Sequence, residues 1–234
     1  MQRAKARPNR DRASLVSSRS IATVSSFVRP SWRGRVHAVA FAAAVPAGLF
    51  LVISAKSLVG QIVAAVFVIG VLLVYGTSAA YHTLARTESS RRILRSLDHS
   101  MIFVLIAATL TPLCALGLPR SWSIPVLVAV WAGALAGIVL KLTAFGRYQW
   151  FGYALYPILG GAMLVVFPML LHRLSAASLT LVALGVLAYC AGGLLFIARR
   201  PDPWPNTFGY HEVWHLWTVA AAACHFAAIE LIVR

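Results

Sequence analysis

Residues 59–83 read VGQIVAAVFVIGVLLVYGTSAAYHT, a run of 25 residues without Lys, Arg, Asp or Glu. A helix rises about 1.5 Å per residue, so this run is long enough to cross a hydrocarbon core of about 30 Å. Its apolar residues are continuous rather than alternating, which argues against the strands of a membrane barrel. The stretch therefore predicts a transmembrane helix, and its last turns place Ser78 and His82 on one face.

Other apolar runs predict further membrane helices, over residues 36–55, 98–118, 122–142, 149–171, 178–198 and 210–232. Of the 234 residues, 60% are hydrophobic and 12% are charged, whereas a soluble domain has about 25% charged residues. The connections are short, so successive helices should be antiparallel and mostly adjacent. We predict an all-α membrane protein, a seven-helix transmembrane bundle over residues 34–234, preceded by a disordered basic tail over residues 1–33.

Lys and Arg are distributed unequally between the two sides of this bundle. Seventeen of the 21 lie in the tail and in alternate connections, and the other side has Lys56, Arg120, Arg173 and Arg234. Segments rich in Lys and Arg stay in the cytoplasm. We therefore expect a multi-pass protein of the cell (plasma) membrane with a cytoplasmic N-terminus, an outside C-terminus and an uncleaved first helix.

The formal net charge of +15 raises the question of which anionic partner the chain meets. The basic residues lie in the tail and the connections, and no basic groove lined with aromatic residues is apparent, so nucleic acid is not expected. A basic cytoplasmic face is instead expected to attract anionic lipid headgroups.

Polar residues gather at the predicted cytoplasmic ends of three helices. His82 ends one helix, Asp98 begins the next, and His211 and His215 open the last. Ionisable groups in membrane segments are costly and usually functional. His211 and His215 are one turn apart, so both imidazoles can bind one metal ion, and His82 can supply a third nitrogen. Because three histidines with an open position are typical of catalytic zinc, we predict Zn²⁺ bound by His82, His211 and His215.

Asp98 and Ser78 are the predicted catalytic residues beside this metal. Zinc lowers the pKa of a coordinated water to about 7, and Asp98 can accept its proton. Ser78 lies one turn before His82, and its hydroxyl can donate to a developing oxyanion. A serine within a helix can also bond back to its own backbone, so this role stays one of two interpretations.

Residues 211–215, HEVWH, also match the H-E-x-x-H motif of zinc proteases, with Glu212 as the base. Such proteases need a third ligand downstream, and the one downstream carboxylate, Glu230, is predicted near the opposite face. Glu212 is therefore expected to face the basic pair at 199–200 or water. His37 is expected at the membrane interface.

Three segments together resemble the hemolysin III family, the bacterial relatives of the progestin and adipoQ receptors. They are Ser78-x-x-x-His82, Leu97-Asp98-His99-Ser100, and His211-x-x-x-His215 with His225 beyond. The resemblance covers residues 33–234. One departure is Thr109-Leu110-Thr111-Pro112, where the family often has Tyr in a Thr-Tyr-Thr-Pro stretch. We expect that departure to affect the cavity lining rather than the metal.

The resemblance implies zinc on the three histidines, Asp98 near the zinc-bound water and Ser78 beside the site. The wider superfamily includes alkaline ceramidases, which hydrolyse a lipid amide with zinc. The family resemblance thus implies a zinc-dependent hydrolase of a lipid amide or ester, whose substrate or ligand arrives from the bilayer. Two alternatives stay open: a non-enzymatic membrane sensor or homeostasis protein with structural zinc, and a cytolysin.

Overall fold

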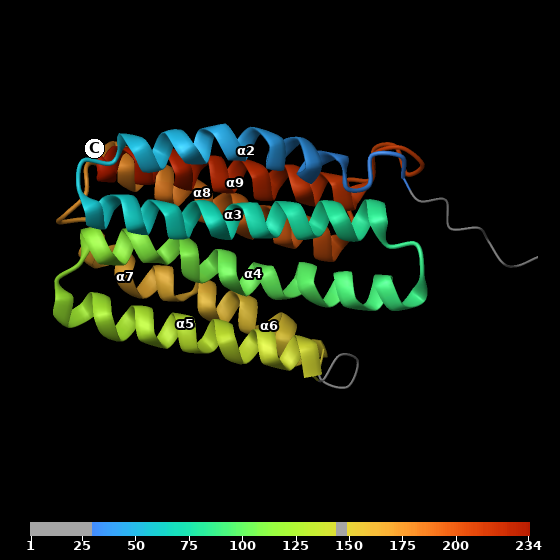
Figure 1. Cartoon of the computed structure of the whole chain (residues 1–234), viewed down its shortest axis with the longest axis horizontal. Helices are drawn as coiled ribbons and strands as arrows, with labels where there is room; N and C mark the ends of the chain where they lie inside the picture. Colours follow the sequence, from blue (N-terminus) through green and yellow to red (C-terminus); the bar gives the residue numbers. More distant parts are fainter. Residues whose placement is uncertain (1–29, 144–148) are drawn as a thin grey trace, which may run out of the picture.

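The structure, a computed structural model, describes residues 30–143 and 149–234. Within these residues the regular secondary structure is helical, apart from an isolated bridge between Trp204 and Phe208. Seven segments of this described part of the chain are long and apolar enough to cross a membrane. Figure 1 shows them side by side along the long axis of the molecule. The prediction of an all-α bundle with seven membrane helices is confirmed.

The helices, labelled as in Figure 1, follow one another with short connections. They are α2 (Arg35–Ser54), α3 (Leu58–Leu84), α4 (Glu88–Gly117), α5 (Arg120–Thr143), α6 (Gln149–Gly160), α7 (Ala162–Leu170), α8 (Ala176–Ala198) and α9 (Tyr210–Val233). Segments α6 and α7 share one membrane span, Phe151–Leu170.

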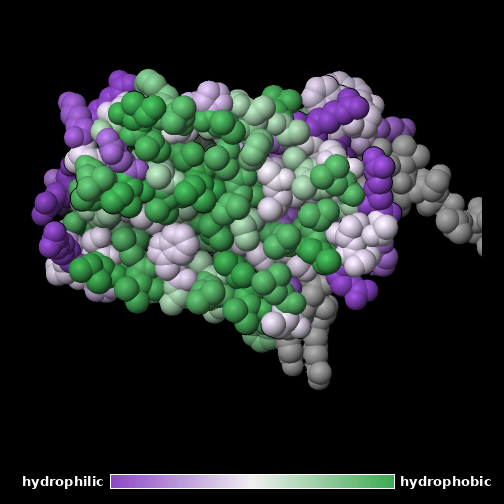
Figure 2. All heavy atoms as spheres, in the orientation of Figure 1, coloured by the Kyte–Doolittle hydropathy of each residue, from purple (hydrophilic) through white to green (hydrophobic). Residues whose placement is uncertain are grey.

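Successive helices make most of the packing contacts, as their short connections require. The last helix, α9, packs against α8 and also contacts α2, α3 and α4. The interior contains Phe67, Phe103, Leu110 and Ile229, each at most 2% exposed. On the face seen in Figure 2, hydrophobic residues cover the middle of the molecule and hydrophilic residues lie at its two ends. Apolar outer faces of this extent require lipid around them, so the protein is an integral membrane protein.

The predicted start of the third membrane helix at residue 98 is wrong. Helix α4 begins at Glu88, because Thr87 and Ser90 form a capping box that satisfies the first backbone N–H groups. Its first turns carry Arg91, Arg92 and Arg95, which no apolar run could reveal. Asp98 therefore lies within a continuous helix instead of opening one.

The fifth predicted helix, residues 149–171, is interrupted. It forms α6 and α7, separated at Gly161. Pro157 lacks a backbone N–H, and the N–H of Gly161 donates to the Pro157 carbonyl at 2.8 Å. Pro157, together with Gly160 and Gly161 shortly after it, explains the interruption.

The two ends of the bundle differ in chemistry. The start of α2, the α3–α4 connection and the start of α9 lie together at one end, on the right in Figure 1. We call this the histidine end, made of residues 30–37, 78–99 and 199–215. It holds every residue predicted to form the metal site. That this end faces the cytoplasm stays a prediction from the charge distribution.

Candidate metal centre

Helix α3 supplies Ser78 and His82, which are one turn apart and both buried. The start of α2 packs directly on His82: a Cβ on Gly34 would lie 2.7 Å from the His82 Cβ. Gly34 also has a φ of 84°, which favours glycine. Both the backbone conformation and the close approach therefore require a glycine here.

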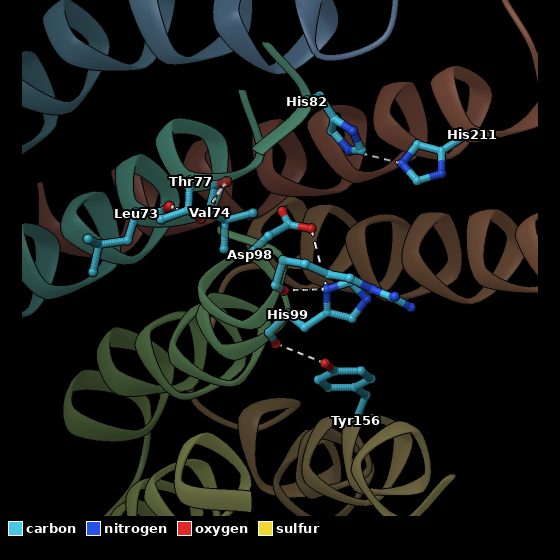
Figure 3. A network of polar contacts seen from close by, with 9 residues as sticks. Leu73, Val74, Thr77, His82, Asp98, His99, Tyr156 and His211 are labelled. Carbon is cyan, nitrogen blue, oxygen red and sulfur yellow. Dashed lines mark hydrogen bonds and ion pairs between the residues drawn. The ribbon is translucent and has the colours of Figure 1, made fainter. Parts of the chain in front are cut away.

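Three histidines from two helices meet at the histidine end. One ligating atom from each of His82, His211 and His215 lies within 4.8 Å of the others. The Nε2 atoms of His82 and His211 are 3.2 Å apart, as Figure 3 shows. The ring centroids of His211 and His215 are 4.6 Å apart. This arrangement can hold a metal ion, because two nitrogens at 2.0–2.1 Å from a tetrahedral zinc would be about 3.3 Å apart.

The chemistry of the donors also fits a metal. His215 is 3% exposed, and its Nδ1 atom has no hydrogen-bond partner among the described residues. Burying an imidazole nitrogen without a partner costs free energy. Three neutral imidazoles with no further carboxylate ligand favour a borderline cation such as zinc over magnesium or calcium.

Helix α4 brings Asp98 to the same end. In Figure 3 the Asp98 carboxylate is on the side of α4 that faces His82 and His211. It also interacts with the Ser78 hydroxyl. The His99 Nδ1 lies 3.5 Å from Asp98 Oδ2 and donates to the Arg95 carbonyl at 2.8 Å. Asp98 is thus placed between the histidine cluster and a second polar group on α4.

The side of α4 away from the cluster is fixed to α6. The Tyr156 hydroxyl donates to the backbone carbonyl of His99 at 2.8 Å. Figure 3 shows His99 between Asp98 and Tyr156. This hydrogen bond limits how far α4 can rotate, so it helps to orient Asp98.

Glu212 takes a different place from the one expected. It is completely buried and forms an ion pair with Arg33, not with the pair at 199–200. Its Oε2 also accepts the backbone N–H of Gly209 at 2.9 Å. Glu212 therefore ties the chain before α2 to the start of α9. Its carboxylate is occupied by structural partners, which does not favour the protease interpretation.

His37 was expected at the interface, but it is buried beside the cluster. It is 3% exposed, and its ring stacks on His215 with centroids 3.9 Å apart. Residue type and spacing did not reveal this, because His37 is the one histidine of its helix. The predicted topology did place the start of that helix at the same membrane face, which was the available signal.

The fold and the site define a class of protein: a seven-helix integral membrane protein with clustered histidines at one end. The haemolysin-III related family matches residues 25–226, and the chain belongs to that family. This confirms the family inferred from the three segments.

Several relatives align with most of this chain. The hemolysin-3 homolog of Bacillus subtilis (strain 168) is 30% identical over 196 residues, 82% of this chain and 89% of that protein. The hemolysin-3 of Bacillus cereus is 28% identical over 198 residues, 82% of this chain and 86% of that protein. An adiponectin receptor protein of Drosophila melanogaster is 26% identical over 189 residues, 73% of this chain and 42% of that protein.

Proposed function

We propose that this protein is a zinc-dependent hydrolase of a lipid amide or ester that reaches the site from the bilayer. The observation that carries the proposal is the grouping of His82, His211 and His215, with ligating atoms within 4.8 Å of one another. When bound, zinc supplies a Lewis acid and a water acidified to a pKa of about 7. The wider superfamily that the family resemblance implies includes alkaline ceramidases, which supports a lipid amide as the substrate.

Asp98 is the proposed proton acceptor. Its side chain is partly exposed, and it faces the histidines in Figure 3. A general base must reach its proton directly or through one water, and this position suits that role. Ser78 is buried and interacts with the same carboxylate, so it stabilises the charged form of Asp98 and holds its orientation.

The metal content of purified protein tests the site. Wild type in detergent should contain about one zinc per chain. His82→Ala and His211→Ala should each lose most of it, because each removes one of three ligands. His172→Ala, at an exposed position, is the matched control and should keep wild-type zinc. Wild-type zinc content in His82→Ala and His211→Ala would reject the site.

Turnover tests the enzyme claim separately. Labelled ceramides and acyl lipids should be cleaved by wild type. Asp98→Asn should retain zinc and lose activity by roughly 10²- to 10⁴-fold, the usual contribution of a general base. Intact lipids in the presence of bound zinc would reject hydrolysis but not the metal site.

One observation favours a second function, a structural metal in a non-enzymatic sensor. The cluster joins α3 to α9, and His37 stacked on His215 adds α2. A metal there would hold three helices together. In that case Asp98→Asn should change neither zinc content nor any lipid turnover, whereas zinc removal should lower the thermal stability strongly.

A further inference from the structure

His225 is a buried imidazole well inside the last membrane span. It lies in the span Tyr210–Val233 and is 2% exposed. It comes ten residues after His215, or about 15 Å further along α9 at helical rise. Ionisable side chains at this depth are costly and usually mark a functional site. At that distance from His215 the ring cannot reach the same metal, so the histidine cluster does not account for it.

The hydrogen bonds of His225 leave one ring nitrogen without a partner. Its Nδ1 lies 2.9 Å from the Ala221 carbonyl. A carbonyl oxygen only accepts, so Nδ1 carries the proton, and Nε2 of the neutral ring is an acceptor. This Nε2 has no hydrogen-bond partner within residues 30–143 and 149–234. A buried acceptor in this state costs free energy, so it suits a ligand that donates a hydrogen bond.

Helix α8 places a complementary donor beside this acceptor. The rings of Tyr189 and His225 are nearly parallel, with centroids 5.9 Å apart and planes inclined by 24°. The Tyr189 hydroxyl is buried and likewise lacks a partner in the described part of the chain. Gly185, one turn before Tyr189, lets the imidazole approach α8 closely, since a Cβ there would lie 2.5 Å from the His225 Cε1. A donor and an acceptor therefore lie on neighbouring rings, and both need a partner.

We propose that Tyr189 and His225 bind a water molecule between α8 and α9, inside the membrane part of the bundle. Water can accept from the Tyr189 hydroxyl and donate to the His225 Nε2 at the same time, so it satisfies both groups. Both polar atoms are closed off from the outer surface, which favours a single water over the hydroxyl of a lipid. The water would join α8 to α9 by a polar link that the surrounding lipid cannot supply.

Hydroxyl-radical footprinting of the full-length chain in detergent, with radicals made by X-ray radiolysis, tests the proposal. The radicals form from water itself, so a bound water labels the side chains that it contacts even where bulk solvent is excluded. Tyr189 and His225 should therefore be modified severalfold faster than Phe67 and Phe103, which are aromatic residues at most 1% exposed in the same bundle. Mass spectrometry of the peptides gives the rates.

Variants assign the label to the proposed water. Tyr189→Phe removes only the hydroxyl, so modification of His225 should fall roughly fivefold, the usual value of one hydrogen bond. Tyr156→Phe is the matched control, because the hydroxyl that it removes donates to the His99 carbonyl, and His225 should keep its wild-type rate. His225→Leu should lower the rate at Tyr189, whereas His225→Gln retains an acceptor and should preserve it.

Two results would overturn the proposal. One is modification of Tyr189 and His225 as slow as that of Phe67 and Phe103, which would indicate a direct hydrogen bond between the two side chains. The other is an unchanged rate at His225 in Tyr189→Phe. The assay needs neither metal nor turnover, so its result is readable whether or not the protein is a hydrolase.

Discussion

His37 lies flat against His215, with ring centroids 3.9 Å apart and planes inclined by 7°. Thr218 fixes both residues. Its hydroxyl donates to the His215 carbonyl at 2.8 Å and therefore accepts from the His37 Nε2 at 3.1 Å. Helix α2 thus supports a candidate metal ligand on α9 through one ring and one hydroxyl.

Replacing His37 by Leu should weaken metal binding without removing any of the three grouped histidines. Losing an outer partner of a metal ligand typically costs about 10- to 100-fold in affinity, because the ligand ring is no longer held in place. The measurement is zinc affinity of purified protein by competition with a chelator.

Two further variants identify the cause of that change. His37→Phe keeps a flat ring and loses the hydrogen bond to Thr218, so its affinity should lie between those of wild type and His37→Leu. His172→Leu alters an exposed histidine at the opposite end and should match wild type. Equal affinity in wild type and His37→Leu would show that the stack does not support the site.

Gly34→Ala should disturb the site through the backbone. The new Cβ would lie 2.7 Å from the His82 Cβ, at a φ of 84° that an L-residue rarely adopts. We expect a loss of about 1–3 kcal/mol in the free energy of unfolding, together with weaker zinc binding. Gly160→Ala is the control, since a Cβ there meets nothing within 4 Å. Thermal unfolding in detergent that ranks the two variants equally would contradict this prediction.

Much of the fold could be predicted because hydrophobic runs report burial in lipid directly. The seven spans follow from them, and most boundaries agree within a few residues. The first turns of α4 could not be found this way, since Arg91, Arg92 and Arg95 are polar and only the cap at Thr87 marks the start. A hydrophobic run indicates which residues contact lipid, but it does not indicate where a helix begins.

The candidate site could likewise be predicted from the sequence only in part. Spacing on one helix grouped His211 with His215, and the topology brought His82 to their depth. The stack of His37 on His215 and the ion pair of Arg33 with Glu212 depend on how α2 rotates against α9. That rotation is decided by side-chain packing between distant segments, which no local pattern in the sequence records.

Glu212→Gln should destabilise the protein and leave its zinc content unchanged. The change removes the charge that pairs with Arg33 in a buried position, which should cost about 1–3 kcal/mol of unfolding free energy. Glu230→Gln breaks a partly exposed pair with Arg234 at the end of α9 and should cost only about 0.5 kcal/mol or less. If Glu212 were instead the general base of a protease, Glu212→Gln would keep wild-type stability and lose activity. Thermal unfolding and zinc content separate the two outcomes.

The orientation of the bundle follows from its charges and can be measured independently of any activity. Fifteen of the 21 Lys and Arg residues lie in the tail or at the histidine end, which should therefore stay in the cytoplasm. Alkaline phosphatase, which is active only outside the cytoplasm, should be active when fused after Arg234 and inactive when fused after Arg199. The reverse pattern would place the histidine end outside and contradict the orientation inferred from the charges. Green fluorescent protein at the same two positions is the matched control, since it should fluoresce only at Arg199.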